Sequence, residues 1–110
     1  MAKAQIDLMG VGGGVTLNPT FSKNGTTKSF NAVVGKHYII IGWASASSAT
    51  NTWNGCDITS MTGGTYEKLG NAYTDGTHLF GATYSYVTAT ATTISFTTSG
   101  SPNFDIIQLD

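Results

Sequence analysis

Apolar and polar positions alternate along most of the chain, in short segments separated by Gly, Asn, Ser and Thr. The longest apolar segment runs from Lys36 to Ala46, with the sequence KHYIIIGWASA. Its aromatic and β-branched side chains pack well on a pleated sheet. The uninterrupted apolarity predicts a strand at the centre of a sheet, covered on both faces. A short buried helix has a similar pattern, but three consecutive isoleucines, Gly35 in front and no helix cap favour the strand.

Shorter strand-like segments flank this central one. We expect strands at residues 4–9, 15–19, 20–23, 26–34, 56–61, 65–69, 72–74, 77–87, 92–98 and 103–109. Asn24-Gly25 and Asp75-Gly76 predict hairpin turns between their neighbours. Pro19 predicts an edge position for the strand that follows it, because proline donates no hydrogen bond to a neighbouring strand.

These segments predict an all-β fold, a single jelly-roll-like antiparallel β-sandwich of about eight to ten short strands. The alternation places Ile94, Phe96, Phe104, Ile106 and Ile107 within reach of its core. We interpret Trp43, and one face of the Tyr84 and Tyr86 pair, as core as well. Gly70-Asn71 is expected to break the strand before it.

The length of 110 residues predicts one domain, residues 1–110. Residues 1–14 are interpreted as an N-terminal docking arm with a glycine-rich connector, Gly10–Gly14. This glycine run has the wrong spacing for a dinucleotide-binding loop, and no helix follows it. Charged residues make up only 10% of the chain and the net charge is −1, so little electrostatic repulsion opposes self-association.

Several classes of function are disfavoured by the composition. Arginine is absent and the five lysines are scattered, so we expect neither nucleic acid nor a membrane as partner. We expect no metal and no cofactor, because no ligand motif with suitable spacing occurs. We also expect no enzyme, because the carboxylates lie far apart along the chain, at Asp7, Asp57, Glu67, Asp75, Asp105 and Asp110.

The cysteine content and the first residues indicate the cellular compartment. Cys56 is the single cysteine, so no intrachain disulfide is possible, and we interpret it as a small buried apolar residue. The first residues lack the apolar run of a secretory signal, which leads us to expect synthesis in a cytoplasm.

The aromatic residues provide the candidate binding positions. Flat apolar side chains beside Asn, Asp and Thr suit the faces and hydroxyls of sugar rings, and Trp53 lies in the most polar loop of the chain. We therefore expect contacts with a ligand or a partner protein at Trp53, Asn54, Tyr66, Tyr73 and His78.

Three segments carry a resemblance to a known group of proteins. They are VVGKHYIIIGWAS at residues 33–45, THLFGATYSYVTATATTISFTTSG at 77–100 and NFDIIQL at 103–109. Together they resemble small β-sandwich domains in virion proteins of tailed bacteriophages. The closing strand also resembles carbohydrate-binding sandwich modules.

The first resemblance implies a non-enzymatic phage structural protein, made in the host cytoplasm and located on the virion. It would be a capsid-surface decoration or head-fibre component that acts by symmetric self-association, as a homo-oligomer such as a trimer, and with other virion proteins. The docking segment would contain Ile6, Leu8 and Met9. The alternative is a carbohydrate-binding or receptor-binding module, tail-associated or lectin-like, whose partner is a cell-surface glycan.

Overall fold

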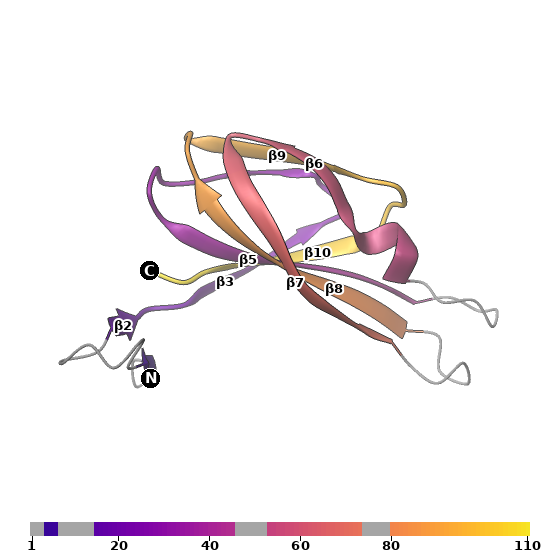
Figure 1. Ribbon diagram of the computed structural model, residues 1–110, viewed down its shortest axis with the longest axis horizontal. Helices are drawn as coiled ribbons and strands as arrows, with labels where there is room; N and C mark the ends of the chain where they lie inside the picture. Colours follow the sequence, from indigo (N-terminus) through magenta and orange to yellow (C-terminus); the bar gives the residue numbers. More distant parts are fainter. Residues whose placement is uncertain (1–3, 7–14, 46–52, 74–79) are drawn as a thin grey trace.

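The computed structural model describes residues 4–6, 15–45, 53–73 and 80–110 (Figure 1). Within them the chain forms ten strands and one short 3-10 helix. These are β1 Ala4–Ile6, β2 Val15–Leu17, β3 Thr20–Gly25, β4 Ser29–Asn31, β5 His37–Ser45, η2 Trp53–Cys56, β6 Ile58–Thr62, β7 Gly64–Tyr73, β8 Phe80–Ala89, β9 Thr93–Thr98 and β10 Asn103–Gln108.

Two antiparallel sheets pack face to face, which confirms the all-β sandwich. The larger sheet has five strands in the order β3-β10-β5-β8-β7, and the smaller has three in the order β4-β9-β6. In Figure 1 the three-stranded sheet lies above the five-stranded one. Among the described residues, strands β1 and β2 pair only with each other, as a separate two-stranded sheet.

The strand order is that of a jelly roll with one strand displaced. In a jelly roll a long antiparallel ribbon folds over, so that the first of eight strands pairs with the last, the second with the seventh and the third with the sixth. Strands β3–β10, β4–β9 and β5–β8 make these pairs here. The innermost pair differs, because β6 and β7 are in different sheets and β7 extends the larger sheet beside β8.

Strand β5 occupies the middle of the five-stranded sheet, as the sequence predicts. Tyr38 and Ile40 point inward and are 2% and 1% exposed. Ile39, Ile41 and Trp43 alternate with them on the outer face and are half-buried. The prediction that both faces are covered is therefore wrong, and so is the core position of Trp43, because the second sheet covers only one face.

The two hairpin predictions have different outcomes. Strands β7 and β8 pair antiparallel, as the Asp75-Gly76 signal predicts, although residues 74–79 themselves lie outside the described residues. The Asn24-Gly25 hairpin is wrong. A tight turn does form there, with Gly25 at φ 57° and the Thr27 N–H donating to the Asn24 carbonyl, but β3 pairs with β10 and β4 with β9. The turn carries the chain from one sheet to the other.

The core lies between the sheets and contains most of the residues expected there. Ile94, Phe96, Phe104 and Ile106 are buried, and the rings of Phe96 and Phe104 meet edge to face at 4.8 Å. Ile107 is wrongly predicted, because β10 alternates and turns it to the outer face. Tyr38 is also in the core, where its hydroxyl accepts the Val33 N–H at 2.9 Å.

Two further expectations concern strand ends and edges. Strand β3 lies at the edge of its sheet, as Pro19 predicts. Gly70-Asn71 does not end a strand. Strand β7 continues through it with a bulge between Lys68 and Gly70, which absorbs one extra residue in the ladder.

Candidate binding site

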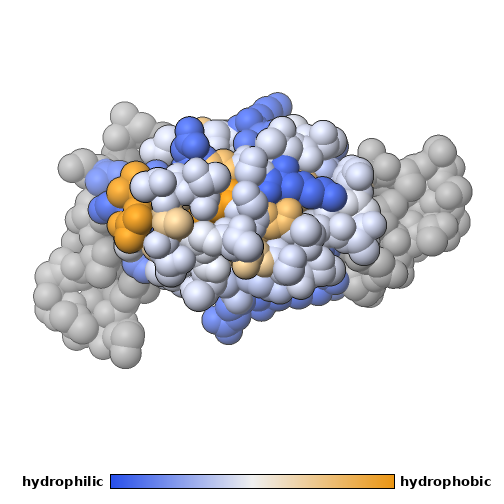
Figure 2. Space-filling view, turned by 90° about the horizontal axis from the view of Figure 1, so that it is seen from above, coloured by the Kyte–Doolittle hydropathy of each residue, from blue (hydrophilic) through white to orange (hydrophobic). Residues whose placement is uncertain are grey.

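The two outer faces of the sandwich differ in polarity. On the three-stranded sheet, hydroxyl groups bond across strands, with Thr59 Oγ1 and Ser60 Oγ each 2.7 Å from Thr97 Oγ1. All three residues are exposed. Figure 2 views the molecule from this side: most of the described atoms are pale, near the middle of the hydropathy scale, and the strongest hydrophobic colour lies toward one end, with smaller apolar areas near the middle. A polar outer face is normal for a sandwich in water.

The outer face of the five-stranded sheet carries large apolar side chains instead. Cross-strand pairing places Phe21 beside Ile107, Ile107 beside Ile39, and Ile39 beside Tyr86. Directly paired residues point to the same face, so these four residues form a continuous row across four strands. We call them the apolar row. Phe21, on the edge strand β3, is 57% exposed.

A hollow lies next to this row on the same face. It has a volume of about 320 Å³ and is lined by Ile41, Trp43, Ala82, Tyr84 and Asp105. We call it the hollow. Strand pairing builds it, because Ile41 lies between Tyr84 on β8 and Asp105 on β10, and Trp43 lies beside Ala82.

One hydrogen bond fixes the main polar group of the hollow. The indole Nε1–H of Trp43 donates to Asp105 Oδ2 at 3.0 Å. This bond holds the indole and the carboxylate in a fixed relation, and no described residue donates to Asp105 Oδ1. Asn103 and Lys23 lie on the same face, paired with Trp43 and Asp105 respectively.

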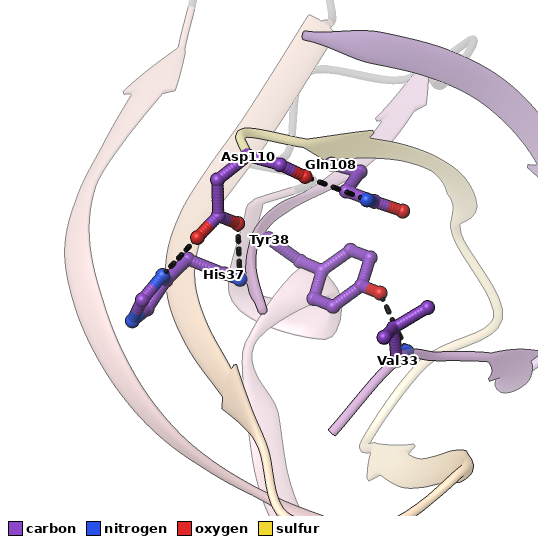
Figure 3. A network of polar contacts seen from close by, with 5 residues as sticks. All are labelled: Val33, His37, Tyr38, Gln108 and Asp110. Atoms are coloured by element: carbon purple, nitrogen blue, oxygen red, sulfur yellow. Dashed lines mark hydrogen bonds and ion pairs between the residues drawn. The ribbon is translucent and has the colours of Figure 1, made fainter. Parts of the chain in front are cut away.

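The end of β10 is tied to the start of β5 by a second polar group (Figure 3). Asp110 accepts the backbone N–H of His37 at 2.7 Å, and its other carboxylate oxygen is 2.8 Å from Nδ1 of the His37 ring. Burial alone would raise the pKa of Asp110. The two His37 hydrogen bonds and the charges of His37 and Lys36 outweigh it, so the pKa lies below its usual value.

Cys56 lies under the opposite end of β5. It is 1% exposed, as expected from the sequence, and its carbonyl accepts the Thr83 hydroxyl at 2.9 Å. Burial raises the pKa of the thiol, and the charge of Asp57 raises it further. A second cavity of about 230 Å³ borders it, lined by Ala44, Gly55, Cys56, Gly100, Ser101 and Pro102. A buried thiol with a raised pKa is a poor nucleophile, so Cys56 does not supply this cavity with a reactive group.

The residues predicted as contacts are only partly described. Trp53 and Asn54 are in η2, and Tyr73 ends β7, but the side chains of all three lie outside the described part of the chain, as does His78. Tyr66 lies on the edge strand β7, is 38% exposed and lines neither cavity. Of the expected docking segment, Ile6 ends β1 and pairs with Val15, while Leu8 and Met9 lie outside the described residues.

The sequence did not predict the hollow. It assigned Trp43 to the core and gave Asp105 no role. The available signal was the alternation of β10, which puts Asn103, Asp105 and Ile107 on the face opposite Phe104 and Ile106. The sequence did not show which strands lie on either side of β10, so it did not show which residues share that face with Asp105.

Two features are absent from the described residues. No three His, Cys, Asp or Glu side chains there are grouped so that they would hold a metal ion. No helix in that part of the chain has the length and apolarity needed to cross a bilayer.

Comparisons with protein-family models, with curated proteins and with solved structures found no match to this chain.

Proposed function

We propose that this chain is a non-enzymatic structural protein of a tailed bacteriophage, a capsid-surface decoration or head-fibre component that acts by symmetric self-association. The bacteriophage assignment rests on the resemblance of residues 33–45, 77–100 and 103–109. The association rests on one observation, the apolar row of Phe21, Ile107, Ile39 and Tyr86 on the outer face of the five-stranded sheet.

The apolar row supports association because it contrasts with the hydroxyl-rich outer face of the three-stranded sheet. A sandwich that works alone in water needs polar groups on both outer faces, and the three-stranded sheet has them. The low charge of the chain offers little repulsion between copies. A second copy that covers Phe21 would remove its exposed apolar surface from water, at about 25 cal/mol per Å².

Symmetry sets the form of the assembly. In a two-fold pair both copies contribute the same patch, and in a closed ring every copy contributes the same two patches, so in either case one substitution in the apolar row weakens every contact at once. The expected state is a homo-oligomer such as a trimer, presented on the particle together with other virion proteins.

The test is the solution mass, measured by light scattering after size exclusion over a range of protein concentrations. We expect the intact chain to form a symmetric oligomer and Phe21→Ser to dissociate it, raising the dissociation constant by about tenfold or more. Phe21 is exposed, so its replacement should leave the fold intact.

Val34→Ser is the matched control. Val34 is also 57% exposed but lies in the turn before β5, away from the apolar row. It should leave the oligomer unchanged. A monomer at every concentration, or equal dissociation by both variants, would contradict the proposal.

A further inference from the structure

The side chains that line the hollow suit a flat ring. Trp43 and Tyr84 provide aromatic surfaces on neighbouring strands, and Ile41 and Ala82 complete the apolar lining. Its volume of about 320 Å³ lies at the lower end of the range for small-molecule sites. An occupant of the size of one sugar ring would lay its C–H groups against these surfaces.

The polar side of the hollow requires an occupant with hydrogen-bond donors. Asp105 Oδ2 already accepts the Trp43 indole N–H, and Oδ1 has no donor among the described residues. A purely apolar occupant would desolvate this oxygen without replacing its hydrogen bond, at a cost of about 1–3 kcal/mol. A hydroxyl group that donates to Oδ1 avoids that cost.

The neighbouring groups favour a neutral hydroxylated ligand over a cation. Lys23 lies across from Asp105, so its positive charge offsets the attraction that the carboxylate would offer a cation. Asn103, paired with Trp43 on the same face, supplies both a donor and an acceptor. Hydroxyl groups donate and accept, whereas an ammonium group only donates.

From this arrangement we propose that the hollow binds one pyranose ring of a neutral carbohydrate. Trp43 and Tyr84 contact the apolar face of the ring, Asp105 Oδ1 accepts a hydroxyl, and Asn103 and Lys23 bond the hydroxyls at the rim. The hollow and the apolar row lie side by side on one face but share no residue, so substitutions can test the two functions separately.

The test is an NMR titration of the ¹⁵N-labelled chain with glucose, galactose, mannose and N-acetylglucosamine in turn. The indole N–H resonance of Trp43, identified by its loss in Trp43→Phe, reports on the hollow itself. We expect at least one sugar to shift it saturably. Asp105→Asn should weaken that binding by about tenfold or more, because it replaces the free acceptor while the side chain keeps its size.

Glu67→Gln is the control variant. Glu67 pairs with Tyr86 on the same outer face but lies outside the hollow, so its loss should leave the affinity unchanged. The Phe21→Ser chain should bind sugar like the intact chain, which separates this inference from the proposed assembly.

Four outcomes would overturn the inference. One is that none of the four sugars shifts the resonance. A second is that Glu67→Gln weakens binding as much as Asp105→Asn. A third is that choline chloride, and none of the sugars, gives the saturable shift, which would indicate a cation site. The fourth is a shift that depends on protein concentration alone, which would mean that a second copy fills the hollow.

Discussion

Gly63 is the residue at which the chain leaves the three-stranded sheet and enters the five-stranded one. It separates β6 from β7 and has φ +79°, a conformation that side chains disfavour. Its carbonyl accepts the N–H groups of Thr90 and Ala91, at 2.9 and 3.0 Å. A Cβ atom there would clash with the carbonyl oxygen of Thr93. The corner that joins the two sheets therefore requires glycine.

Gly63→Ala should lower the free energy of unfolding by about 3 kcal/mol. This figure adds the cost of placing a side chain in the left-handed conformation to the cost of the clash with the backbone. Urea unfolding followed by circular dichroism measures the change. Gly70→Ala is the control, since a Cβ at Gly70, in the bulge of β7, meets no atom within 4 Å. Similar losses in both variants would show that the conformation at Gly63 is not the cause.

At the scale of the element, β10 is held at its end by contacts with β5. The Leu109 N–H donates to the His37 carbonyl at 2.8 Å, and Asp110 accepts from the backbone and ring of His37 (Figure 3). Strand β10 carries Asp105 and Ile107, so these contacts also help to position the hollow and the apolar row.

The lowered pKa of Asp110 makes this contact dependent on pH. A carboxyl whose pKa is lower in the folded state stabilises the fold above its unfolded pKa, about 3.9, and loses that contribution as the pH falls through the folded pKa. Asp110→Asn should therefore lower the free energy of unfolding by about 1 kcal/mol at neutral pH, since the side chain is 28% exposed.

In the same variant, the free energy of unfolding should fall less steeply than in the intact chain as the pH drops below about 5. Urea unfolding at a series of pH values, for the intact chain and for Asp110→Asn, gives both quantities. If the difference in the free energy of unfolding between the two proteins stays the same down to about pH 2, Asp110 does not cause the loss of stability in acid.

The elements also show what could be predicted from the sequence. Strand β9 was predictable because Ile94 and Phe96 alternate with polar residues, and that pattern is local. The partner of a strand is not local, and the Asn24-Gly25 turn has the same residues whether the next strand pairs with the previous one or crosses to the other sheet. Trp43 and Asp105 are likewise 62 residues apart and meet only through the register of β5 and β10.

At the scale of the whole molecule, the contact surfaces are distributed over separate regions. The three-stranded sheet presents hydroxyl groups, and the five-stranded sheet presents the apolar row and the hollow. Strands β1 and β2 form a third unit, because their ladder joins neither larger sheet. The two-stranded unit is therefore separate from the sandwich in its pairing, whereas the hollow and the apolar row adjoin each other on one face.

The separation leads to a prediction about the N-terminal segment. Deleting residues 1–10 removes β1, and because β1 pairs only with β2, the unfolding midpoint of the sandwich should change little. The apolar row lies within residues 21–107 and stays intact, so the oligomer should keep its number of copies.

Co-sedimentation with phage particles that lack the protein should be lost, since Ile6, Leu8 and Met9 are the proposed docking residues. Truncated protein that still decorates particles would refute the docking role, and a large fall in the calorimetric midpoint would place the segment within the fold.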